Sequence, residues 1–329
     1  MSRAVSVKIH PSQFPENVRR DLLQSLRSRQ INHKFHYDSI KQTQRWLALH
    51  QACSPSRTDP DCSTIYDQSF VGAAEQIETS SVHLVGLGCG GGQKDTRLLQ
   101  CLRGQGKELF YTPADVSVAM VLVAQQTARS VLAQEHCFPF VCDLGSSDNV
   151  SEIFSQPANP TVKRLLTFFG MIPNFEPQLI LPKLSALLRP EDLLLFSANL
   201  APGTDYPAGV QKILPLYDND LTRHWLLAFL TDLGVEKGDG DLKFCIEDCP
   251  AGTQLKRVAA YFHFQKKSVI ELSEERFEFG PDEKIRLFFS YRHTPERIGS
   301  LLAENGITVL DQWITKSEEE GVFLCRKSG

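Results

Sequence analysis

The sequence predicts an α/β protein with a doubly wound, mostly parallel sheet and a second, smaller α+β domain. Three observations support this fold class. Short apolar runs alternate with helical patterns between residues 81 and 200, as expected for strand–helix–strand units. The first of these runs leads into a cluster of glycines at 86–92. After residue 200 the alternation stops, and the strand-like runs that follow are spaced differently.

The alternating region is expected to hold five strands of one parallel sheet. The expected strands are 82–87, 107–115, 137–143, 163–170 and 191–200. The helices expected between them are 95–106, 116–134 and 178–190, with a helical or irregular stretch between the third and fourth strands. Right-handed crossovers between successive parallel strands would place these helices on both faces of the sheet.

The flanking segments predict a separate domain. Apolar residues near helical spacing predict helices over 15–29 and 39–52, and a run rich in Pro, Ser and Asp at 53–64 predicts a loop. The later elements are expected to be a helix over 213–234, strands over 256–265, 284–292 and 321–327, and a helix over 294–306 with Thr294 as N-cap and Pro295 at N1. We therefore expect a core domain at 63–202 and a second domain formed by 1–62 plus 203–329.

The overall composition argues against several classes of protein. The net charge is −4, without the basic bias of a nucleic-acid-binding protein. No apolar run approaches the length that crosses a bilayer, and the N-terminus lacks the apolar core of a signal peptide. The nine cysteines form no CxxC pair, so we interpret them as reduced thiols and predict no metal site. These features predict a cytoplasmic protein.

The glycine cluster follows the first expected strand, where open α/β sheets bind their ligands. Gly86, Gly88 and Gly91 match the pattern G-x-G-x-x-G. That pattern, taken literally, predicts a dinucleotide whose pyrophosphate lies at the helix N-terminus. One hypothesis for the chain is therefore an NAD(P)-dependent oxidoreductase.

Three further residues favour S-adenosylmethionine (SAM) as the ligand. Asp115 ends the second expected strand, where a carboxylate meets ribose hydroxyls, and Asp143 ends the third, where a polar group meets the adenine amino group. Lys94 and the backbone N–H groups of the helix start are suited to the carboxylate of the cofactor. The alternative for each aspartate taken singly is a helix N-cap. The ordered set predicts SAM rather than a dinucleotide.

With these residues in place, the chain resembles the histidine-specific methyltransferase family, which includes the histidine Nα-methyltransferase of ergothioneine biosynthesis and the fungal 4-dimethylallyltryptophan N-methyltransferase. The resemblance covers most of the chain. It depends on FHYD at 35–38, LGCGGGQKDTRLL at 87–99, YTPADVS at 111–117, FFGMIPNFEP at 168–177, LPLYDND at 214–220 and KIRLFFSYR at 284–292. The fourth motif reads like G-G-T-I-G-N in the family, so this chain departs from it at Phe169, Met171 and Pro173 and keeps Gly170, Ile172 and Asn174.

The resemblance implies a Rossmann-like SAM-methyltransferase core, a lid-like substrate domain and an active site in the cleft between them. It implies catalytic roles for Tyr37 and Asn174. The cofactor-binding positions that it implies are Tyr37, Gly88, Gly90, Lys94, Asp115, Asp143 and Leu144. The substrate-binding positions are Tyr37, Asn174, Tyr217, Ala260, Phe288 and Ser290. Asn174 and Tyr217 match residues that hold the substrate's α-amino and carboxylate groups; the alternatives are a turn residue and an amphipathic-helix residue.

Two of these positions bear on the identity of the acceptor. Family members that use histidine have a glutamate where Phe288 aligns and a methionine where Ala260 aligns. Burying an imidazole N–H without an acceptor costs about 1–3 kcal/mol, so we expect free histidine not to be the preferred substrate. An apolar or aromatic side chain fits better, unless Phe288 is simply part of a strand core.

The sequence therefore predicts a SAM-dependent N-methyltransferase that acts on the amino group of an amino acid or an amino-acid-derived small molecule. A neutral amine would attack the sulfonium methyl group in line. Two alternatives remain at this point: the oxidoreductase described above, and a non-catalytic SAM-binding protein in which Phe169, Met171 and Pro173 block the pocket.

Overall fold

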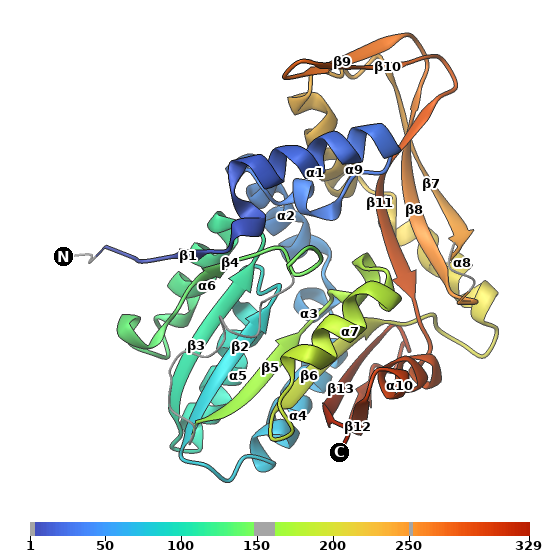
Figure 1. Cartoon of the computed structure of the whole chain (residues 1–329). Coiled ribbons are helices and arrows are strands. Elements are labelled where there is room, and N and C mark those ends of the chain that lie inside the picture. The colour runs from blue at the N-terminus through green and yellow to red at the C-terminus, as the bar shows by residue number, and fades with distance from the viewer. Residues whose placement is uncertain (1–3, 148–161, 250–252) are drawn as a thin grey trace. The chain divides into compact units, whose positions relative to one another are not determined.

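The computed structural model describes residues 4–147, 162–249 and 253–329 (Figure 1). The chain forms two compact units, each built from segments that are distant in sequence. The first unit comprises Met1–Gln13, Pro55–Leu200 and Thr294–Gly329, and the second comprises Phe14–Ser54 and Ala201–His293.

The first unit is organised around an eight-stranded sheet in the order β1-β4-β3-β2-β5-β6-β13-β12. The strands in this order are Lys8–Ile9, Phe140–Val141, Glu108–Asp115, Ser81–Leu87, Lys163–Phe168, Leu193–Asn199, Glu320–Lys327 and Ile307–Ile314. The pairs from β1 to β6 are parallel, whereas β13 pairs antiparallel with both β6 and β12. The strand order reverses direction between β2 and β5, so the topological switch point lies beside the glycine cluster that follows β2.

Helices cover both faces of this sheet. They are α3 (Pro55–Thr58), α4 (Pro60–Glu75), α5 (Gln93–Gly104), α6 (Val118–Ala128), α7 (Pro177–Leu187) and α10 (Pro295–Glu304). Helix α4 packs against α5 and α5 against α6, whereas α7 packs against α10; Figure 1 shows α7 and α10 in front of the sheet and α4 behind it. The apolar face of α4 packs with β2, β6 and β13 in one buried core. This arrangement confirms the predicted doubly wound α/β class.

The five predicted parallel strands are present, with three local differences. The third strand, β4, is only two residues long, and the predicted helical or irregular stretch before β5 lies partly outside the described residues. Helix α6 ends at Ala128, earlier than predicted. The predicted loop at 53–64 is wrong, because Asp59 caps the backbone N–H of Asp61 and Pro60 starts α4. A run of Pro and Asp there is a helix start rather than a linker.

The ends of the chain correct the predicted division into domains. Residues 294–329, expected in the substrate domain, belong to the first unit, because β13 pairs along the full length of β6. Residues 1–13 also belong to it, since β1 pairs with β4. Helix α10 begins after Thr294, whose side chain accepts a hydrogen bond from the N–H of Arg297, with Pro295 at N1 as predicted.

The second unit contains a three-stranded antiparallel sheet and a hairpin. The sheet has the order β11-β8-β7, and the hairpin pairs β10 with β9. These strands are β7 (Gly240–Asp248), β8 (Lys256–Phe264), β9 (Ser268–Leu272), β10 (Glu275–Phe279) and β11 (Lys284–Arg292), and the main helices are α1 (Pro15–Ser28), α2 (Ile40–Cys53), α8 (Tyr206–Tyr217) and α9 (Asp220–Asp232). This unit has its own core, which includes Trp225 and Phe229 of α9.

One predicted helix of the second unit is two helices. The pattern over 213–234 reads as continuous, but α8 ends at Tyr217 and α9 begins after Asn219. The Asn219 side chain accepts a hydrogen bond from the N–H of Thr222, and Asp218 forms an ion pair with Arg223 at 2.6 Å. An asparagine N-cap stabilises a new helix start, so the break leaves Tyr217 at the end of α8.

Among the described residues, no helix is long and apolar enough to cross a membrane. All nine cysteines are free thiols. Over the same part of the chain, no group of His, Cys, Asp and Glu side chains is arranged to hold a metal ion.

Candidate functional site

The turn after β2 is shaped by glycines in left-handed backbone conformations. Gly88, Gly90 and Gly92 have φ values of 66°, 51° and 72°, a backbone conformation that residues with a Cβ rarely adopt. The N–H groups of Gly88 and Cys89 both donate to the carbonyl of Ala114 on β3, at 2.8 and 3.0 Å. The turn is therefore fixed against the end of the neighbouring strand by its own backbone.

The glycines of the literal G-x-G-x-x-G pattern do not share one task. A Cβ on Gly86 would lie 2.1 Å from the carboxylate of Asp95, which is buried under the turn. That carboxylate accepts hydrogen bonds from Tyr111 at 2.7 Å and Thr167 at 2.8 Å, and burial raises its pKa. Gly86 thus leaves space for an internal polar contact between α5 and the sheet. This use of Gly86 does not support the dinucleotide interpretation of the pattern.

Asp115 lies at the carboxyl end of β3 and is bonded to the glycine turn. Its carboxylate accepts hydrogen bonds from the N–H of Gly90 and from the N–H of Ser117, each at 3.0 Å. Burial raises the pKa of Asp115 to about 6, although these backbone hydrogen bonds act to lower it. The structure therefore brings together Asp115 and Gly90, two of the positions predicted to bind the cofactor.

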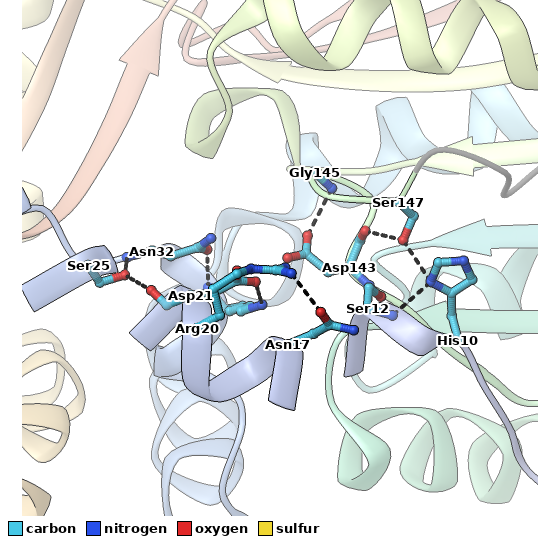
Figure 2. Close-up of polar contacts among 11 residues, drawn as sticks. His10, Ser12, Asn17, Arg20, Asp21, Ser25, Asn32, Asp143, Gly145 and Ser147 are labelled. Carbon is cyan, nitrogen blue, oxygen red and sulfur yellow. Dashed lines mark hydrogen bonds and ion pairs between the residues drawn. The ribbon is translucent and has the colours of Figure 1, made fainter. Parts of the chain in front are cut away.

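Asp143 follows β4 and is held by backbone and side-chain contacts within the first unit (Figure 2). Its N–H donates to the hydroxyl of Ser12 at 3.0 Å, and its carboxylate accepts the N–H of Gly145 at 2.9 Å. Ser147 donates to the Asp143 carbonyl at 2.6 Å. Leu144, the next residue, is buried. The N-terminal segment that carries Ser12 is a support for Asp143 that the sequence did not predict.

Lys94 is in the first turn of α5 and its ammonium contacts other protein groups. Nζ lies 2.8 Å from the hydroxyl of Tyr66, 3.8 Å from the carboxylate of Glu320 and 4.1 Å from the centre of the Tyr66 ring. The side chain is 19% exposed. Its predicted role toward the cofactor's carboxylate remains a prediction, and the structure adds two partners that no sequence pattern indicated.

Asn174 ends a single 3₁₀ turn, Ile172–Asn174, that follows β5 at the carboxyl edge of the sheet. Its N–H donates to the carbonyl of Met171 at 3.0 Å, and its side chain is partly exposed. The turn begins at Gly170, which has a φ of 67° and whose N–H donates to the hydroxyl of Ser197 at 2.9 Å. Asn174 therefore follows β5, the strand that pairs with β2 and so lies next to the strand that leads into the glycine turn.

The three departures from the family motif lie in different surroundings. Phe169 packs against the rings of Tyr66 and Phe70 on α4, at 5.2 and 6.1 Å between ring centres. Pro173 is buried. Met171 lies against the glycine turn, since a Cβ on Gly88 would lie 2.1 Å from its sulfur. A methionine chain is unbranched and adapts its shape readily, so it is a weaker obstruction than a rigid ring.

In the second unit, the structure brings two polar residues to the hydroxyl of Tyr217. This hydroxyl donates to Ser290 at 2.7 Å and accepts a hydrogen bond from the guanidinium of Arg292 at 2.9 Å. The guanidinium also lies 5.4 Å from the centre of the Tyr217 ring. Ser290 and Arg292 are both buried on β11. Tyr217 and Ser290, two of the predicted substrate-binding positions, are thus in direct contact.

Aromatic rings surround the same part of β11. Phe288 lies 5.8 Å from Tyr217, 5.9 Å from Trp225 and 5.1 Å from His33, between ring centres. Ala260 pairs directly with Phe288 across β8 and β11, so the two positions predicted to govern specificity are cross-strand neighbours. The ring of Tyr37 lies 5.6 Å from that of Trp225.

Two histidines near these rings are uncharged at neutral pH. Burial lowers the pKa of His33 well below its usual value, and the pKa falls further because a proton on His33 and one on His36 would repel each other. Burial lowers the pKa of His36 to about 4, although its ring contacts the carbonyl of Leu287. The side chains around Phe288 are therefore aromatic and uncharged, and Arg292 supplies a positive charge nearby.

Sequence reasoning did not identify Arg292, Trp225, Tyr66 and Glu320. Arg292 is the last residue of the KIRLFFSYR motif, so alternation along β11 was a signal that could have placed it on the face of Phe288 and Ser290. Tyr66 and Glu320 are 254 residues apart, and no local pattern links them.

The groups at the switch point of the first unit are of the kinds that a nucleoside cofactor needs. Asp115 is an acidic acceptor fixed at the end of β3, and the glycine turn presents backbone N–H groups at the start of α5. A doubly wound sheet with these groups at its switch point defines a nucleoside-cofactor-binding α/β protein. Comparison with known proteins gives the class more narrowly. The sequence profile of the histidine-specific, SAM-dependent methyltransferases matches residues 18–327, and the chain belongs to this family.

Individual relatives are more distant. The N-methyltransferase imqF of Aspergillus flavus is 25% identical over 263 residues, covering 78% of this chain and 70% of that protein. Among solved structures, magnesium protoporphyrin IX methyltransferase of Synechocystis PCC 6803 is 13% identical with a TM-score of 0.46, covering 90% of this chain and 98% of that one. The 1,6-didemethyltoxoflavin-N1-methyltransferase of Burkholderia thailandensis is 12% identical with a TM-score of 0.43, covering 87% of each chain.

Family membership makes the protein a SAM-dependent methyltransferase with SAM as its cofactor. It decides against the oxidoreductase that the literal glycine pattern suggested. The separate role of each predicted site residue remains a prediction.

Proposed function

We propose that this methyltransferase transfers the methyl group of SAM to the amino group of an amino acid, or of a small molecule derived from one, other than free histidine. The observation that carries the proposal is the contact of Arg292 and Ser290 with the Tyr217 hydroxyl, next to the ring of Phe288. The similarity to a protein named as an N-methyltransferase supports nitrogen as the accepting atom.

SAM supplies a methyl group that is already activated by the positive sulfonium. The protein then has to bind, orient and exclude water. Asp115 is suited to the ribose because its carboxylate is fixed by the N–H groups of Gly90 and Ser117 and still has lone pairs for hydroxyl donors. Asp143 and Leu144 are proposed for the adenine, and Lys94 for the carboxylate.

The acceptor's carboxylate is proposed to bind at Tyr217. The Tyr217 hydroxyl accepts from Arg292 and donates its proton to Ser290. The Ser290 hydroxyl therefore donates to this carboxylate, and it is a stronger donor because hydrogen bonds in a chain polarise one another. Arg292 adds a positive charge behind them, at 2.9 Å from the Tyr217 hydroxyl. An anionic acceptor is therefore favoured over a neutral or cationic amine of the same shape.

The acceptor's side chain is proposed to lie against Phe288, Trp225 and Tyr37. These rings offer apolar faces and edges, which suit aromatic or prenylated side chains. A histidine side chain needs an acceptor for its ring N–H, and Phe288 provides none. Asn174 is proposed to bind the α-amino group, which has to lose its proton before it attacks.

The test compares amino acids with their decarboxylated amines, using SAM labelled in its methyl group. The pairs are tryptophan and tryptamine, phenylalanine and phenethylamine, and histidine and histamine. We expect the aromatic amino acids to be methylated at least about tenfold faster than their amines, because a charge-assisted contact to the carboxylate is lost in the amine. Arg292→Met should remove most of this preference. Arg276→Met, on the exposed β10, is the matched control and should leave it unchanged.

Two results would overturn the proposal. Equal rates for acids and amines in the wild type would remove the carboxylate from recognition. Binding of S-adenosylhomocysteine in calorimetry, with no labelled product from any amine, would instead support a non-catalytic SAM-binding protein.

A further inference from the structure

A cluster of polar side chains, most of them buried, joins four elements of the first unit. Its members are Cys62 and Tyr66 of α4, Lys94 of α5, Ser197 of β6 and Glu320 of β13. Cys62, Tyr66 and Ser197 are fully buried, and Glu320 is 7% exposed. A carboxylate and an ammonium in such a place require mutual compensation.

The hydrogen bonds of the cluster converge on the Tyr66 hydroxyl. An ionised carboxylate only accepts, so the single Tyr66 proton is donated to Glu320. The Tyr66 oxygen then accepts from Lys94 at 2.8 Å and from the Ser197 hydroxyl at 2.9 Å. Glu320 also accepts from the thiol of Cys62 at 3.5 Å. Every partner of Tyr66 is thereby satisfied in one arrangement, which fixes the direction of each bond.

Lys94 is held by this cluster rather than by bulk water. Its Nζ is 3.8 Å from the Glu320 carboxylate and lies over the Tyr66 ring. An ammonium has three donors, of which Tyr66 takes one. A lysine side chain that is anchored at its tip has little remaining rotamer freedom, so its position is determined before any ligand arrives.

The same cluster fixes the turn after β5. The Ser197 hydroxyl, which donates to Tyr66, accepts the N–H of Gly170 at 2.9 Å. Gly170 begins the segment that leads to Met171, the residue that contacts Gly88. The buried carboxylate of Glu320, on β13, is therefore connected through Tyr66 both to Lys94 and to the turn after β5.

We propose that Glu320 is a positioning residue for the amino-acid end of the cofactor. Acting through Tyr66, its carboxylate holds the Lys94 ammonium in place to meet the carboxylate of SAM. The inference rests on the proposed role of Lys94 in cofactor binding. It adds that Glu320 holds Lys94 in the position that this role requires. Glu320 does not itself contact the cofactor.

The replacement Glu320→Gln separates charge from shape. A glutamine has nearly the same volume, but its single amide oxygen serves only one of the two donors, Tyr66 and Cys62, and it gives Lys94 no counter-charge. We expect the Lys94 side chain to lose its fixed position. The cofactor should then lose affinity only where its binding depends on the carboxylate.

The experiment uses two probes that differ at that end. S-adenosylhomocysteine carries the amino-acid portion, whereas 5′-methylthioadenosine lacks it, and both are titrated calorimetrically into the whole protein. We expect Glu320→Gln to weaken S-adenosylhomocysteine roughly tenfold, the effect of losing one charge-assisted contact, with 5′-methylthioadenosine unchanged. Glu304→Gln, an exposed glutamate on α10, is the control and should change neither.

A double-mutant cycle tests whether Glu320 acts through Lys94. Lys94→Met should weaken S-adenosylhomocysteine selectively, and Lys94→Met with Glu320→Gln should be no weaker than Lys94→Met alone. Tyr66→Phe keeps the ring and removes the hydroxyl, so it should reproduce the selective loss. This variant also keeps the inference testable if Glu320→Gln fails to fold.

Three outcomes count against the inference. Equal weakening of both probes would assign Glu320 a purely structural role. Additive effects of Lys94→Met and Glu320→Gln would show that Glu320 acts independently of Lys94. Failure of the wild-type protein to bind S-adenosylhomocysteine would overturn the proposed function itself, and is distinguished from the other two because it needs no variant.

Discussion

The two units present their proposed binding groups in different ways. In the first unit the backbone holds them: glycines with positive φ shape the turn, and the carboxylate of Asp115 is fixed by the N–H groups of Gly90 and Ser117. In the second unit other side chains hold them: Phe288 packs among rings, and Tyr217 is bonded to Arg292. The first arrangement suits a ligand that never changes, and the second suits an acceptor that differs among relatives.

This difference has a physical origin. Backbone geometry at a tight turn tolerates few residue types, so a change there disturbs the turn as well as the ligand. A side chain on a strand face can be exchanged at lower cost when its volume is compatible with its neighbours. We therefore expect substitutions in the first unit to abolish cofactor binding, and substitutions in the second to redirect the choice of acceptor.

The largest effect is expected for Asp115→Ala. Removing a carboxylate that accepts from ribose hydroxyls deletes charge-assisted hydrogen bonds worth about 1.5–3 kcal/mol each, so affinity should fall by roughly 100-fold or more. Calorimetric titration with S-adenosylhomocysteine measures it. Asp67→Ala, at an exposed aspartate of α4, is the control. Unchanged affinity in Asp115→Ala would show that the end of β3 does not bind the cofactor.

A redirected choice of acceptor is expected for Phe288→Glu. The new carboxylate gives an imidazole N–H its acceptor, so the rate with histidine relative to tryptophan should rise about tenfold or more. The variant should also lose stability, because Phe288 is only 7% exposed and a carboxylate there is partly desolvated. The two methylated products, measured by mass spectrometry from an equal mixture, give the ratio.

Phe288→Leu serves as the control for loss of the ring alone. It should lower the rate with aromatic acceptors without raising the rate with histidine. If Phe288→Glu behaves in the same way as Phe288→Leu, the residue belongs only to the core of β11 and does not face the acceptor.

The smallest effect is a pH dependence of cofactor affinity. Burial raises the pKa of Asp115 to about 6, and only its ionised form accepts two hydroxyl donors. Lowering the pH from 7.5 to 5.5 should therefore weaken S-adenosylhomocysteine binding about fourfold, as the carboxylate becomes protonated. Asp115→Asn should remove this dependence, and a wild-type affinity that stays constant over the range would contradict the assignment.

The same pKa shift has the opposite sign for folding. Between pH 3.8, the usual pKa, and about 6, the folded protein binds more protons at Asp115 than the unfolded chain does. The contribution of Asp115 to the free energy of unfolding is therefore fully present at low pH and is lost as the pH rises through that window. Binding and stability should respond to acid in opposite directions at this one residue.

Much of the first unit was accessible to sequence reasoning, because its signals are local. Alternating apolar runs predicted β2, β3, β5 and β6, and the glycine cluster and Asp115 were both predicted at strand ends, where the structure bonds Gly90 to Asp115. Residues 294–329 were assigned to the wrong domain. The sequence of β13 does not indicate which strand it pairs with, and its partner, β6, is more than a hundred residues away in sequence. The split of the predicted helix at Asn219 was missed because its apolar pattern continues across the cap.

The sequence by itself determined the α/β class, the family and the glycine turn, since each is written in neighbouring residues whose backbone preferences are short-ranged. Only the tertiary structure decided that Ala260 faces Phe288, that Arg292 contacts Tyr217, and that Glu320 reaches Tyr66 and Lys94. These contacts depend on strand register and on the packing of distant segments. Register and packing depend on the energy of the whole core. No single stretch of sequence therefore determines which strands and side chains meet.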